Sequence, residues 1–217
     1  QSEKLWFVGL PLLSGRLSGD FKSGLRKIVE KYQLGIRLTP NQDLLLCNIG
    51  EYQRSSITKE LQNIGFTNPE SPRPIERHAI ACPALPLCGL AVTEAERLIP
   101  TVLTRIEVLL HKLKIQKTIL IRMTGCPNGC ARPYMAELAL VGSGLNQYQL
   151  WLGGSKSLER LAEPYIQKMQ IDDLEKIIEP LLMSWKSISS SKDFGDYVVS
   201  AGKEKINQIL FSGEKRP

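Results

Sequence analysis

The residues with the clearest chemical potential are four of the five cysteines, because they form two short pairs. The first pair, Cys82 and Cys88, has the spacing C-x5-C, and the second pair, Cys126 and Cys130, has the spacing C-x3-C. Four soft, anionic thiolates that meet in a fold need a cation between them, unless they form disulfides. The two pairs therefore predict a four-thiolate site.

Three kinds of site could use four cysteines. Structural zinc favours ligands two to four residues apart, so the x3 gap suits it and the x5 gap is long. An iron–sulfur cluster is wider than one ion and takes its thiolates from looser loops, so unequal gaps suit it better. Disulfides are typical of small secreted scaffolds, whereas five cysteines in 217 residues are sparse and odd in number. The spacing of the cysteines favours an iron–sulfur cluster. A zinc site, and redox-active or unrelated thiols, remain as alternatives.

The second cysteine loop carries few bulky side chains, because Gly125, Pro127 and Gly129 lie in it. Backbone N–H groups in such a loop can turn inward toward inorganic sulfides. Helix-compatible runs follow both pairs, at 89–113 and at 131–140. We expect the positive ends of both helices to point at the bound group, although an ordinary loop-to-helix start has the same pattern.

The sequence around the cysteines resembles a known family. The strings that carry the resemblance are ACPALPLC (81–88), EAER (94–97) and IRMTGCPNGCARPYMAEL (121–138). They are similar to the assimilatory sulfite and nitrite reductases, and most similar to the ferredoxin-dependent sulfite reductases of cyanobacteria and plastids. The resemblance extends from Leu5 through RLTPNQ (37–42) to FGDY (194–197), which is nearly the whole chain.

This resemblance implies an oxidoreductase that reduces sulfite to sulfide with six electrons from ferredoxin, using a 4Fe-4S cluster coupled to siroheme. The implied cluster ligands are Cys82, Cys88, Cys126 and Cys130. Cys130 matches the residue that also binds the siroheme iron, so it is the implied catalytic cysteine and the electron bridge. The family further implies cofactor contacts from Asn41, Gln42 and Asn128, and a weaker one from Arg37.

Several of these residues have a plainer explanation. Asn41 and Gln42 suit a turn, and Asn128 suits a turn or a helix entry. Arg122 and Arg132 flank the second cysteine loop, where they could contact siroheme carboxylates or sulfite, or form salt bridges at the surface.

The pattern of apolar residues predicts a mixed α/β (α+β) fold with two domains. Residues 1–70 are expected to form a ferredoxin-like unit, which the resemblance makes the second copy of a repeated half-domain. Its expected elements are strand 5–13, helix 21–32, strands 36–39 and 44–47, and helix 56–64. Cys47 lies in an apolar strand and is expected in the core. The segment Pro69–Pro74 is typical of a linker between the two domains.

Residues 71–217 are expected to form the α/β domain that holds siroheme and the cluster. The strand 118–123 would deliver Cys126 at its carboxyl end, where open α/β sheets bind their ligands. The other expected elements are strands 138–141, 148–152 and 197–200, helix 172–186, interrupted or kinked at Pro180, and helix 203–211. His111 is expected on a solvated helix face.

The chain has a net charge of +6, which suits anionic partners but is also typical of a solvated surface. The implied partners are acidic ferredoxin, sulfite, and an N-terminal half of the same enzyme that carries the cationic residues for the sulfite oxygens. No membrane partner is expected, because no apolar run approaches membrane length and no signal-peptide pattern is evident. The start at Gln1 suggests a piece of a longer polypeptide, in a cyanobacterial cytoplasm or a plastid stroma.

Two other functions remain open. A ferredoxin-dependent nitrite reductase would use the same cofactors on another anion. A basic, metal-stapled module could instead bind nucleic acid without catalysis, although no basic–aromatic interleaving supports it.

Overall fold

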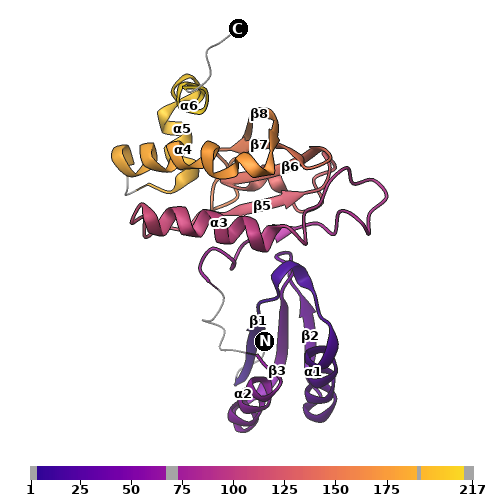
Figure 1. Cartoon of the computed structure of the whole chain (residues 1–217). Helices are drawn as coiled ribbons and strands as arrows, with labels where there is room; N and C mark the ends of the chain where they lie inside the picture. The colour runs from indigo at the N-terminus through magenta and orange to yellow at the C-terminus, as the bar shows by residue number, and fades with distance from the viewer. Residues whose placement is uncertain (1–3, 67–72, 190–191, 213–217) are drawn as a thin grey trace. The chain divides into compact units, whose positions relative to one another are not determined.

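The computed structural model describes residues 4–66, 73–189 and 192–212, and it divides the chain into two compact units, Gln1–Arg77 and His78–Pro217 (Figure 1). The expected domain boundary at residue 70 and most of the expected linker Pro69–Pro74 fall outside the described residues.

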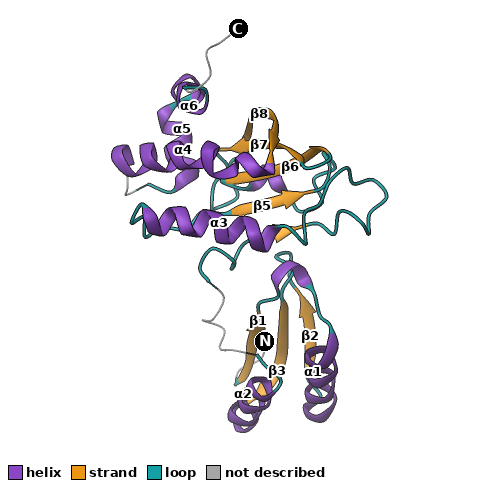
Figure 2. Ribbon diagram, viewed as in Figure 1, coloured by secondary structure: helices purple, strands orange, loops and turns teal. Residues whose placement is uncertain are grey.

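The first unit is a three-stranded antiparallel sheet with two helices (Figure 2). Its elements are β1 (Leu5–Leu10), the 3-10 helix η1 (Leu13–Gly15), α1 (Gly19–Tyr32), β2 (Gly35–Leu38), β3 (Leu44–Gly50), the 3-10 helix η2 (Glu51–Gln53) and α2 (Arg54–Asn63). The strand order is β1-β3-β2, so β3 is central. Every strand and helix expected in this region is present, with small shifts at the ends.

Apolar residues of β3 and the two helices form the core of the first unit. Its buried members are Leu10, Leu25, Ile28, Leu34, Leu44, Leu46, Ile49, Ile57, Leu61 and Phe66. Both helices are amphipathic, and burial of their apolar stripes on the sheet provides most of their stability. Cys47 is buried in β3, which confirms its assignment to the core.

The second unit is built on a mixed five-stranded sheet. Its strands are β4 (Ile80–Ala81), β5 (Ile121–Thr124), β6 (Leu138–Gly144), β7 (Gln147–Leu152) and β8 (Glu163–Gln170), in that spatial order. Strands β4, β5 and β6 run parallel, whereas β6, β7 and β8 are antiparallel. The helices are α3 (Ile99–Lys112), α4 (Leu174–Ser189), α5 (Phe194–Ala201) and α6 (Lys203–Leu210), with 3-10 turns η3 (Pro133–Met135) and η4 (Ile171–Asp173).

Helices α3 and α4 lie side by side next to the sheet (Figures 1 and 2). The guanidinium of Arg105 on α3 forms an ion pair with the carboxylate of Glu175 on α4. Lys112 forms a second ion pair with Glu179 over 2.6 Å. Both helices bury apolar residues, among them Ile106 of α3 and Leu181 of α4. Helix α4 continues through Pro180, so the helix is not interrupted there, and the alternative of a kink stays a prediction.

Three expectations for the second unit are corrected by the structure. Helix α3 begins at Ile99 rather than at residue 89, because the segment before it makes turns that bond to the second cysteine loop. Residues 131–140 form η3 and the start of β6 rather than a helix, because Leu138 to Val141 are buried in the sheet between β5 and β7. Residues 197–200 belong to α5 rather than to a strand.

Candidate metal centre

The first and second cysteine pairs begin at the carboxyl ends of neighbouring parallel strands. Cys82 follows β4 directly, and Cys126 follows β5 after the single residue Gly125. Because Ala81 of β4 is paired with Met123 of β5, the two cysteine loops leave the sheet at nearly the same level. This edge is where open α/β sheets bind ligands.

Hydrogen bonds tie the two cysteine loops together at Gly125. Its carbonyl oxygen accepts from the N–H groups of Val92 and Thr93, at 2.9 and 3.3 Å. Its own N–H donates to the Sγ atom of Cys82 at 3.3 Å. The amide of Glu96 also donates to the Cys82 carbonyl, at 3.1 Å. The segment after Cys88 is therefore bound to the residue before Cys126.

Only glycine fits at position 125. A Cβ atom there would lie 2.6 Å from the Cβ of Ala84 and 2.7 Å from the carbonyl oxygen of Thr93. The backbone of the second cysteine loop therefore packs against the first loop with no space for a side chain at position 125.

The thiol of Cys82 is affected by the charges of both cysteines of the second pair. Burial raises the pKa of the Cys82 thiol, and the charges of Cys130 and Cys126 raise this pKa further, against hydrogen bonds from the Gly125 and Ala84 amides that lower it. Cys88 lies in the same loop as Cys82, since its amide donates to the Ala84 carbonyl at 2.7 Å.

The four cysteines differ in exposure. Cys82 and Cys126 are buried, Cys88 is intermediate and Cys130 is exposed. All of them are free thiols, as is Cys47. Three of the four cysteines are therefore at least partly shielded from solvent, whereas Cys130 is not.

Within the described ranges, no set of three or more His, Cys, Asp or Glu side chains is arranged to hold a metal ion. A cluster places iron and sulfide atoms between its ligands, so its thiolates need not approach as closely as those around one ion. The donor set fits such a group in its chemistry: it has four free thiols, and the amide of Gly125 already points at one of them. The assignment of all four as ligands remains a prediction.

Tyr134 holds the second cysteine loop from its far end. Its hydroxyl donates to the carbonyl oxygen of Pro127 at 2.7 Å. Its ring meets that of Trp151 on β7 edge to face, with ring centroids 4.6 Å apart. Gly129 has a φ of 69° and leaves room for the Tyr134 ring, which a Cβ atom would meet at 2.9 Å. The loop is thus fixed on β7 as well as on the first cysteine loop.

Arg122 and Arg132 lie close together, but only one of them is at the surface. Arg122 on β5 is 1% exposed. Its Nη1 group donates to the carbonyl oxygen of Arg132 at 3.1 Å. Burial, and then the charge of Arg132, lowers the pKa of Arg122 to about 10. The alternative of a surface salt bridge is therefore wrong for Arg122, and its contact with a cofactor remains a prediction.

The other predicted contacts are more scattered. Asn41 and Gln42 lie in the first unit, in the turn between β2 and β3, where the Asn41 amide donates to Thr39 Oγ1 at 3.3 Å. Asn128 is exposed between Cys126 and Cys130. The turn explains the first two residues without a ligand, and their cofactor roles stay predictions. His111 is exposed, as expected, and so is His78.

Sequence reasoning did not identify Thr93, Tyr134 or Tyr148, which support the cysteine loops. Of these, only Tyr134 lies in a sequence segment that carries the family resemblance. That segment does not indicate which atom accepts the hydrogen bond of the Tyr134 hydroxyl.

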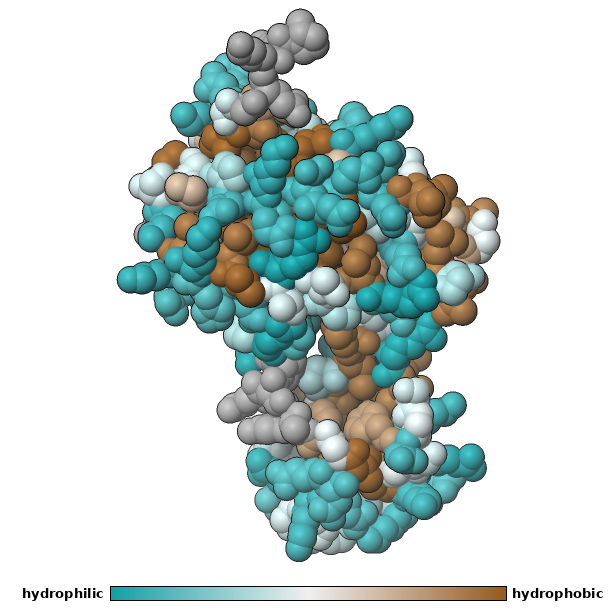
Figure 3. All heavy atoms as spheres, viewed as in Figure 1, coloured by the Kyte–Doolittle hydropathy of each residue, from teal (hydrophilic) through white to brown (hydrophobic). Residues whose placement is uncertain are grey.

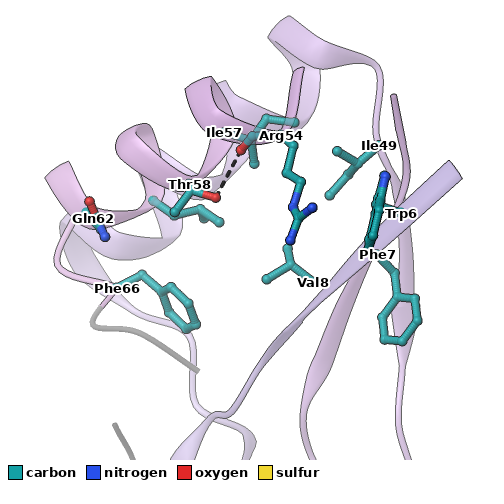
Figure 4. A pocket seen from close by; sticks show the side chains of 10 residues that line it. Trp6, Phe7, Val8, Ile49, Arg54, Ile57, Thr58, Gln62 and Phe66 are labelled. Carbon is teal, nitrogen blue, oxygen red and sulfur yellow. Dashed lines mark hydrogen bonds between the residues drawn. The ribbon is translucent and has the colours of Figure 1, made fainter. Parts of the chain in front are cut away.

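Exposed apolar side chains occur in the first cysteine loop, and an apolar hollow lies in the first unit. In Figure 3, apolar side chains gather at the end of the second unit where the loop after β4 projects, and Leu87, Leu90 and Val92 are exposed in that loop. A hollow of about 460 Å³ lies between β1 and α2 of the first unit, lined by Trp6, Ile57 and Phe66 among others (Figure 4). The Arg54 guanidinium lies 4.1 Å from the centre of the Trp6 ring. Most of the side chains lining this hollow are apolar, so we assign it no chemistry.

Comparison with known proteins agrees with the fold. Residues 1–64 match the family model described as the nitrite/sulfite reductase ferredoxin-like half domain. The chain is 45% identical over 215 residues to the sulfite reductase [ferredoxin] of Synechococcus elongatus, an alignment that covers 96% of this chain and 34% of that protein. It is 37% identical to the sulfite reductase [NADPH] hemoprotein beta-component of Staphylococcus saprophyticus, covering 91% of this chain and 36% of that protein.

A solved structure shares the fold. The Mycobacterium tuberculosis NirA protein superposes with a TM-score of 0.74 at 22% identity, covering 92% of this chain and 39% of that one. The chain spans about a third of the length of the curated relatives it matches.

The chain is therefore similar along nearly its whole length to sulfite reductases, and its residues 1–64 match the ferredoxin-like half domain of the nitrite and sulfite reductases. Both curated relatives described above are named sulfite reductases, and the one with 45% identity is the ferredoxin form.

Proposed function

We propose that this chain is the cofactor-bearing portion of a ferredoxin-dependent sulfite reductase, which reduces sulfite to sulfide with six electrons. The observation that carries the proposal is that the two cysteine pairs begin at the carboxyl ends of the neighbouring strands β4 and β5, where the Gly125 amide donates to the Cys82 sulfur. The similarity to sulfite reductases along nearly the whole chain supports the choice of reaction.

In this proposal a 4Fe-4S cluster is held by Cys82, Cys88, Cys126 and Cys130, and siroheme lies against Cys130. The cluster and siroheme supply the electron transfer that no side chain can perform. The exposure of Cys130 supports its role, because a shared thiolate must be open to both groups. Asn41, Gln42 and Asn128 are proposed as siroheme contacts on the family resemblance.

The chain's own residues would position these groups and shield them from water. Gly125 presents its N–H group to a cysteine sulfur, which favours the thiolate form and tunes its donor strength. Tyr134 and Trp151 hold the loop that carries Cys126 and Cys130 on the sheet.

The proposed partners are sulfite, reduced ferredoxin and the remaining part of the enzyme. A net charge of +6 favours the approach of an anion and of an acidic electron carrier. The cyanobacterial relative suggests a cytoplasmic setting, with a plastid stroma as the alternative. No helix in the part of the chain that the structure describes is long and apolar enough to cross a membrane.

Turnover of sulfite and nitrite with reduced ferredoxin tests the proposal, measured on the longest protein that carries this chain. We expect sulfide formation, a higher kcat/KM for sulfite than for nitrite, and a siroheme spectrum in the visible range. Cys130→Ser should abolish sulfide formation, whereas the matched change Cys47→Ser should preserve it, since Cys47 lies in the other unit. A preference for nitrite, or an active Cys130→Ser variant, would contradict the proposal.

A further inference from the structure

A directional chain of hydrogen bonds connects the first cysteine loop to the hairpin of β6 and β7. The hydroxyl of Thr93 donates to the hydroxyl of Tyr148 at 3.0 Å, and Tyr148 donates in turn to the carbonyl oxygen of Glu94 at 2.8 Å. The amide of Asn146 donates to Thr93 Oγ1 at 3.2 Å. Each hydroxyl group thus donates one hydrogen bond and accepts one, in a site where Thr93 and Tyr148 are 0% exposed.

The backbone of Thr93 meets both cysteine loops. Its N–H group donates to the carbonyl oxygen of Gly125, the residue before Cys126, at 3.3 Å. Its carbonyl oxygen accepts from the amide of Leu85, which lies between Cys82 and Cys88, also at 3.3 Å. Thr93 therefore touches the chain on each side of the candidate centre and is itself anchored by its side chain to β7.

The surroundings leave Thr93 little freedom to move. A Cβ atom on Gly142 of β6 would lie 2.7 Å from the Thr93 Cγ2 methyl, so the strand runs directly against this side chain. Strand β6 in turn pairs with β5, which leads into Cys126. The position of Thr93 is therefore coupled to the strand that delivers the second cysteine pair.

We propose that Thr93 and Tyr148 are positioning residues, whose hydroxyl pair sets the distance and register between the two cysteine pairs so that one cluster can bind all four. This inference rests on the proposed function and extends it to residues that touch no cofactor. Groups that orient metal ligands in this way affect metal retention by about tenfold or more when they are removed.

The test combines two readouts on the 217-residue chain. The first is the rate of cluster loss after anaerobic reconstitution with iron and sulfide, together with the EPR spectrum of the reduced cluster. The second is the rate at which the thiols of Cys82 and Cys126 are alkylated in the chain without iron, which does not depend on the cluster. Thr93→Val keeps the shape and removes the hydroxyl, so we expect about tenfold faster cluster loss, an altered EPR spectrum and faster alkylation.

Rescue and control variants separate positioning from general stability. Thr93→Ser restores the hydroxyl and should recover most of the wild-type behaviour. Tyr148→Phe should resemble Thr93→Val, and the double variant should be less than additive, because both changes break the same chain of bonds. Ile106→Val on α3 is a buried control, and Thr104→Val on the exposed face of α3 repeats the same substitution away from the site.

The outcomes are distinct. Unchanged alkylation and cluster loss in Thr93→Val would overturn the inference, as would failure of Thr93→Ser to rescue or an equal effect of Ile106→Val. A wild-type chain that binds no cluster would overturn the proposed function and this inference with it. A wild-type chain that binds a cluster unaffected by Thr93→Val would overturn this inference alone.

Discussion

The amide of Gly125 donates to the sulfur of Cys82 over 3.3 Å, which joins the residue before the second cysteine pair to the first residue of the other pair. Such a bond stabilises a thiolate relative to a thiol. Hydrogen bonds to the sulfurs are also among the factors that set the reduction potential of an iron–sulfur cluster. One backbone contact therefore links the fold of the loops to the chemistry proposed for them.

Replacement of Gly125 by alanine should disrupt this contact. The added methyl would overlap Ala84 and the Thr93 carbonyl, so we expect a loss of about 1 to 3 kcal/mol in the free energy of unfolding, measured by urea denaturation. The matched control is Gly89→Ala beside Cys88, where a Cβ atom meets nothing within 4 Å. Equal stability of the Gly125 variant and the wild type would contradict the close packing described for the two loops.

Replacement of Tyr134 by phenylalanine should loosen the second cysteine loop. The change removes the bond to the Pro127 carbonyl but keeps the ring on Trp151, so the expected cost is about 1 kcal/mol. The readout is alkylation of the buried Cys126 thiol in the chain without iron, which we expect to be faster in the variant. Tyr165→Phe on β8 is the control and should leave this rate unchanged.

The buried carboxyl of Glu137 provides a pH-dependent test of the second unit. Its two oxygens accept from the amides of Leu120 and Gly195, at 2.8 and 2.9 Å. Burial raises its pKa above the ordinary value of 4.5, so its stabilising contribution is fully present below that pH and declines as the pH rises through the folded-state pKa.

Glu137→Gln leaves one of these amides facing an NH2 group. We expect a loss of about 1 to 3 kcal/mol near pH 5, and a smaller difference from the wild type at pH 8, measured by urea denaturation at each pH. The exposed carboxylate of Glu163, which pairs with Lys203, supplies the matched change Glu163→Gln, with an expected effect below about 0.5 kcal/mol. A difference that grows with pH would contradict the sign of the shift.

Much of the fold could be predicted because the apolar periodicity was unambiguous. Helix α1 was predicted from a stripe at Phe21, Leu25, Ile28, Val29 and Tyr32, and the structure has a helix there. The prediction of a strand at 197–200 was wrong, because Val198 and Val199 suggested an extended chain. The buried residues Phe194, Tyr197 and Val198 are spaced as on one helix face, and this spacing indicates α5.

The remaining errors arose from contacts between distant segments. Residues 131–138 contain good helix formers, but Pro133 and the pairing of Leu138 with Ile121 draw them into η3 and β6. Strand β8 was not predicted, because it is an edge strand with many polar residues. The cysteine pairs were found by spacing, whereas the bond between Thr93 and Tyr148 joins residues 55 positions apart and leaves no local signal.

The account depends on the convergence of both cysteine pairs on one group, and a Mössbauer spectrum of the chain reconstituted with 57Fe tests it most directly. We predict the signature of a 4Fe-4S cluster in the wild-type chain and in Cys47→Ser, and its loss in Cys82→Ser and Cys126→Ser. Iron bound without a cluster signature, zinc bound in its place, or a cluster that survives either of the latter two substitutions would contradict the account.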